Sequence, residues 1–289
     1  MILNLLTEEM VMEYKIVVDS CCDLPKEIAK DDHFSFVPLT LMVDDFSIID
    51  DNTFDQADFL KKVRESKNCP KSACPSPERY MNEFAAENTD IYVVTLSADL
   101  SGSYNSAQLG RNLYIEEGGT NNVHIFNSMS ASTGEALIAI KVKELVEQGL
   151  AFDEVVAVAE EFTQNMKTYF VLESLETLRK NGRLTNLQAI IASALNIKPL
   201  MSAEGGKIVK LDQARGINKA LAKMIAMIKE KTVNSEEKIL AIAHCNCFER
   251  AEYVKNEALK LVKFKDVIIV DTAGVSSMYA NEGGIIVTV

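Results

Sequence analysis

The feature that most constrains this chain is a repeated alternation of short apolar runs with stretches of helical periodicity. Runs such as Lys15–Val18, Ile91–Leu96 and Val123–Asn127 have the length and apolar character of buried strands. Ser103–Ile115 and Gly134–Gln148, which follow two of these runs, have the spacing of helices. Parallel strands need crossover connections, which helices usually supply. The alternation therefore predicts a mostly parallel sheet covered by helices.

The rhythm changes near residue 150. Asp153 is expected to cap a helix over Glu154–Asn165, and a hairpin is expected around Glu204-Gly205-Gly206. We therefore expect two α/β domains, the first Rossmann-like with a mostly parallel sheet and the second with a mixed sheet and helices. Their ranges are 12–150 and 151–289, with an N-terminal extension over residues 1–11. Further expected elements are a helix opening at Pro25, an extended run at Phe34–Val43 that Pro38 interrupts, helices at Asp55–Ser66 and Pro77–Glu87, a breaker cluster at Cys69–Pro77, two short helices across Asn181-Gly182-Arg183, and a final strand at Gly284–Val289.

Charge and hydropathy narrow the functional classes. The 289 residues include 42 acidic and 30 Lys and Arg residues, for a formal net charge of −12. Nucleic-acid binding and docking on anionic bilayers both depend on clustered basic residues, so the acidity argues against both. Hydrophobic residues make up 47% of the chain, which is too many for a disordered protein. Small molecules and other proteins remain as partners.

The cysteines point to a reducing compartment. No apolar stretch reaches the ~18 residues of a membrane-spanning helix, and the first residues lack the basic region of a secretion signal. We therefore expect a cytoplasmic protein whose six cysteines are thiols. Cys245 and Cys247 lie beside His244, but a fourth metal ligand is not apparent, so no metal site is expected. A nucleophilic cysteine in a loop, at Cys22 or Cys74, stays open as the basis of an enzyme.

Three loops place small hydroxyl residues just before a predicted helix. They contain Ser20, Ser72 and the run Ser101-Gly102-Ser103. Free N–H groups and the helix dipole attract anions at such positions, and ligands of open α/β sheets lie beyond the carboxyl ends of the strands. The alternative is that these serines only cap helices. Phosphate-loop and dinucleotide glycine patterns are absent, which counts against a phosphate- or nucleotide-binding module without removing it.

Six segments in order carry a family resemblance. They are VDSCCDLP (Val18–Pro25), KSACPSP (Lys71–Pro77), LSADLSGSYNSA (Leu96–Ala107), LETLRKNGRLTNLQA (Leu175–Ala189), NIKPLM (Asn196–Met201) and QARGINKA (Gln213–Ala220). From about Tyr14 to the C-terminus the chain resembles the DegV family, which includes the fatty-acid-binding subunits of bacterial fatty acid kinase. The resemblance implies two α/β domains with a buried acyl chain whose carboxylate lies near their junction.

The resemblance also implies roles for individual residues. Ser72 and Ser101 match hydroxyl residues that bind the carboxylate, and Arg183 matches an arginine near the head group and the kinase-facing surface. Tyr279 stands where the family typically has a His, and as a neutral hydrogen-bond donor it is expected to complete the carboxylate site. Ser20, Gly102 and Ser103 are expected in supporting loops. The helical face of Leu187, Ile190, Ile191, Ala194 and Leu195 could line the acyl channel or belong to the core.

The function implied is that of a lipid-binding protein rather than an enzyme. The chain is expected to hold a long-chain fatty acid in an apolar tunnel and to present its carboxylate to a separate fatty acid kinase, which forms an acyl phosphate. No cofactor and no catalytic residue are expected. Partners would be the fatty acid and the kinase catalytic subunit, with the chain a monomer that contacts membranes transiently. The alternatives are a small-molecule α/β enzyme with a Cys nucleophile and the phosphate- or nucleotide-binding module.

Overall fold

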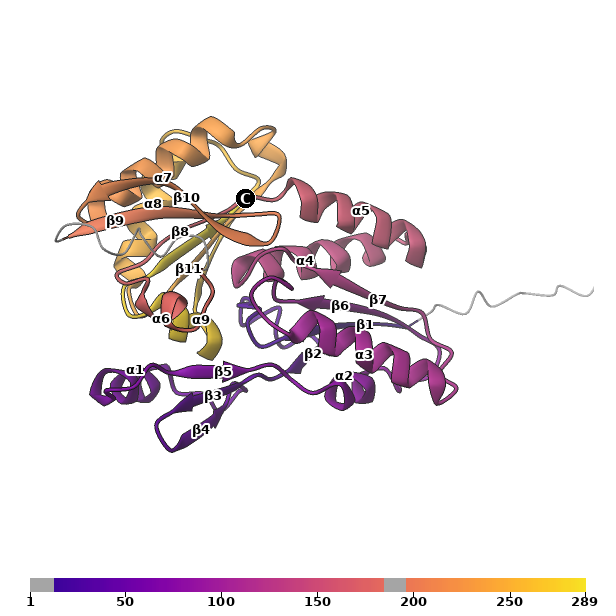
Figure 1. Ribbon diagram of the computed structural model, residues 1–289. Coiled ribbons are helices and arrows are strands. Elements are labelled where there is room, and N and C mark those ends of the chain that lie inside the picture. Colours follow the sequence, from indigo (N-terminus) through magenta and orange to yellow (C-terminus); the bar gives the residue numbers. More distant parts are fainter. Residues whose placement is uncertain (1–12, 185–195) are drawn as a thin grey trace, which may run out of the picture.

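The first part of the chain forms a four-stranded parallel sheet between two layers of helices (Figure 1). A computed structural model describes residues 13–184 and 196–289. The strand order is β2-β1-β6-β7, from β1 (Glu13–Asp19), β2 (Phe34–Val37), β6 (Thr89–Thr95) and β7 (Val123–Asn127). Ile16 and Val18 point to one face and Val17 to the other, as the two-residue period of a strand requires. Both faces are thus buried, which explains the continuous apolar runs.

Four helices cover this sheet. α2 (Pro77–Glu83) and α3 (Ser103–Glu116) pack on the Val17 face, where Tyr80 and Phe84 are fully buried. α4 (Thr133–Glu147) and α5 (Phe152–Asn165) pack on the opposite face. The sequence prediction of a helix-covered parallel sheet is therefore confirmed.

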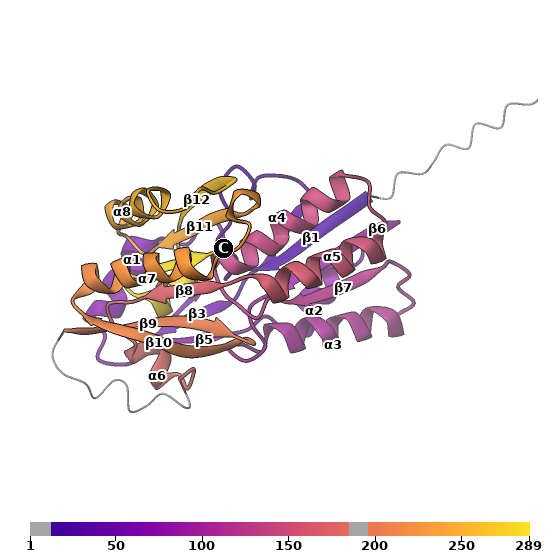
Figure 2. The same cartoon turned by 90° about the horizontal axis from the view of Figure 1, so that it is seen from above.

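The C-terminal part forms a six-stranded mixed sheet in the order β10-β9-β8-β13-β11-β12. β11 (Ile239–His244) and β12 (Asp266–Asp271) pair in parallel, and the other neighbours are antiparallel. The predicted hairpin is β9 (Ile197–Glu204) and β10 (Lys207–Arg215), while β8 (Thr168–Val171) and β13 (Ile285–Thr288) fill the centre. α7 (Ile217–Lys231) and α8 (Phe248–Leu259) cover one face, and Figure 2 shows α7 lying along the sheet.

A third, three-stranded sheet corrects one expectation. The run Phe34–Val43 is interrupted at Pro38 as expected, with β2 before the interruption and β3 (Thr40–Val43) after it. β3 pairs antiparallel with β4 (Phe46–Ile49) and β5 (Lys71–Ala73), so the segment expected only to break structure contains a strand. α1 (Gln56–Glu65) connects β4 to β5. A strand of three residues, such as β5, is too short to show the alternation of apolar and polar residues that would predict it.

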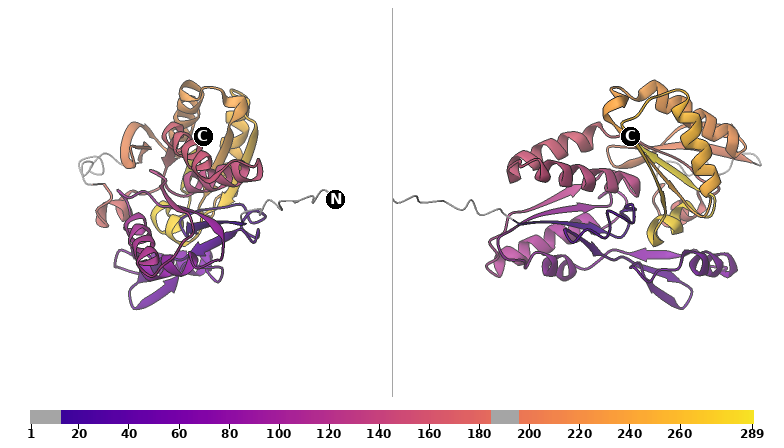
Figure 3. Two further views of the ribbon diagram at one scale, coloured as in Figure 1. Left: turned by 90° about the vertical axis from the view of Figure 1, so that its right-hand side faces the viewer. Right: turned by 180° about the vertical axis from the view of Figure 1, so that it is seen from behind.

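Other differences are local. The segment after Pro25 forms hydrogen-bonded turns rather than an α-helix, and the N-cap of α5 is Ala151, so Asp153 lies within the first turn. α6 (Glu176–Lys180) is the first of the two short helices expected around Arg183, and the second falls outside the described residues, as do the extension 1–11 and the apolar face that begins at Leu187. An unexpected helix, α9 (Gly274–Ala280), lies between the mixed sheet and the three-stranded sheet (Figures 1 and 3).

A division of the chain near residue 150 stays a proposal. α5 begins after that point, yet its Val155 and Ala159 belong to the same buried cluster as Ile16 and Val18 of the parallel sheet. α5 then leads directly into β8 of the mixed sheet. We propose that α5 joins the two parts as a packed helix rather than as a loose linker.

Candidate functional site

An apolar pocket lies between the mixed sheet and the loops that follow the strands of the parallel sheet. Its lining comes from the mixed sheet, from loops after β1, β6 and β7, from α6 and the segment after it, and from α9. Most of the lining is hydrophobic: Cys21, Leu96, Leu100, Phe170, Leu172, Leu178, Ile208, Val275, Ala280 and Ile286. A concave apolar site with few polar groups is the usual form of a small-molecule pocket, and this lining suits an aliphatic chain. The volume of about 90 Å³ holds only a few methylenes, so a long chain requires the walls to part.

Three of the predicted site residues meet beside this pocket, and two of them, Arg183 and Tyr279, line it. Ser72 projects from β5, and its Oγ lies 3.2 Å from the Tyr279 Oη of α9. The Arg183 guanidinium lies 5.7 Å from the centre of the Tyr279 ring, within the range of a cation–π contact. All three side chains are half-buried. Residues more than 200 positions apart therefore form a small cluster of hydroxyl and guanidinium donors.

The loop that follows β6 lies beside the same cluster. Arg183 Nε donates a hydrogen bond to the Leu100 carbonyl at 3.0 Å, which fixes the guanidinium next to Ser101. Gly102 brings this loop close to the residue that follows β5, since a Cβ at Gly102 would lie 2.9 Å from Cys74 Sγ. A side chain at position 102 would thus force the Cys74 thiol to move aside. Ser101 is held near Arg183, although its own Oγ accepts the Ser103 N–H at 3.2 Å.

The two remaining predicted residues, Ser103 and Ser20, are buried in the loops around the site. Ser103 is fully buried and starts α3. Ser20 is also buried, and its hydroxyl donates to Asp50 at 2.9 Å while accepting the Leu39 N–H at 3.0 Å. Ser20 therefore holds two loops together and does not reach the cluster around Tyr279.

Four buried carboxyl groups lie behind the pocket, and the sequence reasoning missed them. They are Asp19, Asp23, Asp50 and Glu135. Burial raises the pKa of Asp23 to about 7 and that of Asp50 to about 6. Burial raises the pKa of Glu135 well above its usual range, and the neighbouring Asp19 charge adds to the effect. Asp19 ends β1, and Asp23 and Asp50 lie in loops after strands, so the sequence pattern at these positions indicated turns rather than buried acids.

Tyr279 is suited to donate a hydrogen bond as a neutral phenol. Burial raises its pKa above the usual value, while the hydrogen bond with Ser72 and the charge of Arg183 partly oppose this shift. The phenol is therefore neutral at pH 7 and carries a hydrogen for an anionic ligand.

The cysteines do not form a visible nucleophile–base pair. Burial raises the pKa of Cys22 well above its usual value, so this residue is a neutral thiol. Cys74 is exposed, and its Sγ lies 3.7 Å from Ser106 Oγ. His33 pairs with Asp31 at 2.7 Å and His124 with Glu160 at 2.9 Å. Among residues 13–184 and 196–289, no group of three or more His, Cys, Asp or Glu side chains is arranged to hold a metal ion.

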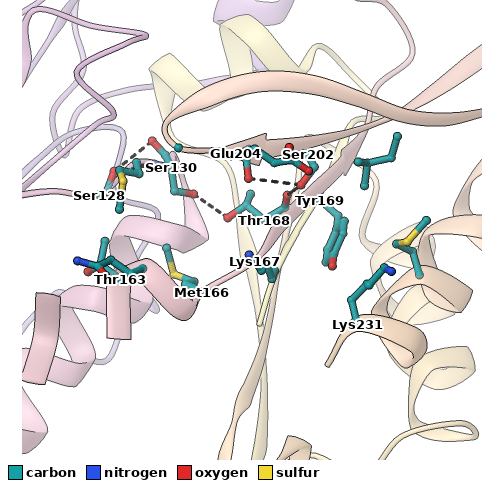
Figure 4. A pocket seen from close by; sticks show the side chains of 16 residues that line it. Ser128, Ser130, Thr163, Met166, Lys167, Thr168, Tyr169, Ser202, Glu204 and Lys231 are labelled. Atoms are coloured by element: carbon teal, nitrogen blue, oxygen red, sulfur yellow. Dashed lines mark hydrogen bonds between the residues drawn. The ribbon is translucent and has the colours of Figure 1, made fainter. Parts of the chain in front are cut away.

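A second cavity lies on the other side of a hydroxyl pair. Ser130 Oγ and Thr168 Oγ1 are 2.7 Å apart, and these two residues together with Ala203 line both cavities. Figure 4 shows this pair, with Thr163 and Met166 on one side and Tyr169 and Lys231 on the other. The second cavity is more polar, so the apolar pocket is the better place for an aliphatic chain.

In the part of the chain that the structure describes, no helix combines the length and apolar character needed to cross a bilayer.

Comparison with known proteins places this architecture in a family. The model of the DegV family of uncharacterised proteins matches residues 13–289. A DegV domain-containing protein of Streptococcus gordonii is 36% identical over 285 residues, which cover 95% of this chain and 98% of that protein.

Solved structures give the same result. A DegV family protein from Ruminococcus gnavus, refined with vaccenic acid, has a TM-score of 0.94 at 50% identity over 96% of this chain and 100% of that one. The fatty acid kinase (Fak) B3 protein of Streptococcus pneumoniae, loaded with linoleic acid, has a TM-score of 0.87 at 32% identity over 96% and 99% of the two chains. Family match, sequence identity and fold agree, and the chain belongs to the DegV family.

Proposed function

We propose that this chain binds a long-chain fatty acid, with the acyl tail in the apolar pocket and the carboxylate at Ser72, Tyr279 and Arg183. The observation that carries the proposal is the cluster of these three donors beside a mostly apolar pocket, which Arg183 and Tyr279 line. The fatty acids in the related Ruminococcus and Streptococcus structures support the same ligand class.

The tail supplies most of the affinity in this proposal. Each buried methylene contributes about 0.8 kcal/mol, so a chain of ~16 carbons offers roughly 12 kcal/mol before the costs of binding. A hydrogen bond to a charged group contributes about 1.5–3 kcal/mol, and the carboxylate must first lose its water. The donors therefore act mainly to fix the position of the carboxylate.

Ser72 and Tyr279 can change partners when a carboxylate binds. Their hydroxyls lie 3.2 Å apart, and either can be the donor. A carboxylate between them can accept one hydrogen bond from each, and the Arg183 guanidinium supplies the compensating charge. The site needs such local donors because the chain as a whole carries a net charge of −12.

We further propose that the bound carboxylate is offered to a separate kinase. Ser72, Arg183 and Tyr279 are only half-buried, so this end of the pocket is open to a partner. The kinase would transfer a phosphoryl group to a carboxylate oxygen and form an acyl phosphate. In this view the chain is a cytoplasmic, monomeric substrate carrier, and it holds no catalytic residue. The name of the Streptococcus pneumoniae relative, a fatty acid kinase B protein, supports this role.

Mass spectrometry of the ligand provides the direct test. We expect a fatty acid in the extract of the denatured purified protein, and binding when fatty acid is added to delipidated protein. Acyl phosphate formation with the kinase subunit then tests presentation. A protein that neither contains a fatty acid nor binds one would contradict the proposal.

A further inference from the structure

We infer that Asp50 is a positioning residue that holds Tyr279 in register with Ser72. This inference rests on the proposed function, because it concerns the site assigned to the fatty acid carboxylate. Asp50 does not touch that site itself. It acts through α9, the helix that carries Tyr279.

Asp50 holds the start of α9 with both carboxylate oxygens. The Gly274 N–H donates to Oδ1 at 2.7 Å, and the Val275 N–H donates to Oδ2 at 2.9 Å. These N–H groups belong to the first turn, which has no partner within a helix. Tyr279 lies about one turn further along α9, so the position of the first turn determines where the Tyr279 hydroxyl lies.

The same residue belongs to the sheet that carries Ser72. Asp50 follows β4 directly, and its own N–H donates to the Leu39 carbonyl, just before β3, at 2.9 Å. β3 pairs with β5, where Leu41 lies opposite Ser72. These contacts form a closed loop. It runs from Ser72 through β3 to Asp50, then along α9 to Tyr279, whose hydroxyl meets Ser72 again. Asp50 is the side chain through which this sheet holds the start of α9.

Gly274 indicates how closely the two parts are fitted. A Cβ at this position would lie 2.5 Å from Asp50 Oδ1 and 2.7 Å from Leu41 Cδ1, the residue opposite Ser72. Any side chain at position 274 would thus push α9 away from the sheet. Two separate observations, the paired hydrogen bonds and the space restricted to glycine, converge on one contact.

Other contacts hold α9 from different elements. Asp23, in the loop after β1, accepts the Ala273 N–H at 2.7 Å. Gln56 of α1 donates to the Thr272 carbonyl at 2.8 Å. These contacts keep α9 in place when Asp50 is altered, so loss of Asp50 shifts the helix rather than releasing it.

Affinity for two ligands with the same tail provides the test. We expect Asp50→Asn to bind a fatty acid about tenfold more weakly than the original chain, and to bind the fatty alcohol of equal length within about twofold. Gly274→Ala should show the same selective loss and serves as the second variant if Asp50→Asn does not fold. The matched control is Asp51→Asn, because the exposed Asp51 bonds only to Thr53 next to it.

The outcomes separate this inference from the proposed function. Equal weakening of acid and alcohol in both folded variants would mean that Asp50 only stabilises the fold, and no change in either ligand would mean that it does not position Tyr279. Failure of the original chain to bind the acid would instead overturn the proposed function.

Discussion

The two ends of the pocket are built in different ways. The apolar body uses side chains such as Phe170 and Ile286, which lie opposite each other on adjacent strands of one sheet and pack in one core cluster. The polar end brings together β5, the segment after α6, and α9, which share no sheet. Regular strand pairing therefore determines the shape of the apolar body of the pocket. The polar end depends instead on a few specific hydrogen bonds between separate elements.

This difference has a consequence for specificity. Apolar contacts add up with area and tolerate small shifts. Hydrogen bonds to a carboxylate require donors placed within a few tenths of an ångström. Changes in the body should affect acids and alcohols alike, while changes at the polar end should affect acids alone.

The largest effect is expected from Ala203→Phe, which tests the body. Ala203 lies on β9 opposite Ile208 and lines the apolar pocket, so a phenyl group there competes with the acyl tail. Displacing about four methylenes costs roughly 3 kcal/mol, a loss of more than 100-fold in affinity. Titration should show equal losses for a fatty acid and its alcohol. A loss restricted to the acid would contradict the division between the two ends.

A change in stability with pH tests the buried acids behind the polar end. Burial raises the pKa of Asp23 to about 7, far above that of an aspartate in the unfolded chain. Its stabilising contribution is complete below pH 4 and is lost as the pH rises towards 7. Unfolding free energy should therefore fall by about 2 kcal/mol between pH 5.5 and pH 8.

Chemical denaturation of Asp23→Asn at the two pH values provides the measurement, with Asp51→Asn as the control. The Asp23 variant should lose about 2 kcal/mol of the pH dependence and keep the part that comes from the other buried acids, whereas the control should keep all of it. A dependence that is equal in both variants would show that Asp23 is not the group responsible.

Tyr279→Phe sharpens the comparison at the polar end. The ring remains beside Arg183, but the hydroxyl that meets Ser72 is removed. Loss of one hydrogen bond to a charged group should weaken fatty acid binding about tenfold. Fatty alcohol binding should change by less than twofold in the same assay. Equal losses of affinity for the fatty acid and the fatty alcohol would mean that Tyr279 contacts the acyl tail rather than the carboxylate.

The smallest effect is expected for Ser101→Ala. The Ser101 hydroxyl already accepts the Ser103 N–H, so only part of its bonding capacity serves the ligand. Acid affinity should fall roughly threefold, since a shared hydrogen bond contributes less than 1 kcal/mol. Phosphorylation of the bound acid by the kinase subunit should slow at the same time. If Ser72→Ala and Ser101→Ala both leave affinity and phosphorylation unchanged, the two serines do not bind the carboxylate.

Elements with strong periodicity could be predicted from the sequence. β1, β6 and β7 are apolar runs, and α4 ends at Glu147, one residue before the expected end at Gln148, so the parallel sheet follows from local pattern and length. α9 could not be predicted in this way. It is short, and Val275, Ser276 and Ser277 are all buried, so it has no exposed polar face to produce an amphipathic pattern.

Only part of the candidate site could be predicted from the sequence. The resemblance drew attention to Ser72, Tyr279 and Arg183, and the structure places them together. Neither the resemblance nor the local pattern indicated Asp50. Its role arises from a hydrogen bond across 224 positions, and the spacing of residues along a chain does not contain such information.

The way in which α5 joins the two parts restricts how a ligand can enter. The core under α4 and α5 also contacts Ile239 and Ile268 of the mixed sheet, so a wide opening of the two parts would expose buried apolar surface. Smaller movements of α9 and β5 would expose less buried apolar surface than a wide opening of the two parts. Hydrogen exchange should accordingly slow at α9 and β5 when fatty acid binds and stay unchanged along α4 and α5. A fatty acid would then enter where α9 and β5 separate locally. The rate of fatty acid binding would depend on how often α9 moves away from the three-stranded sheet.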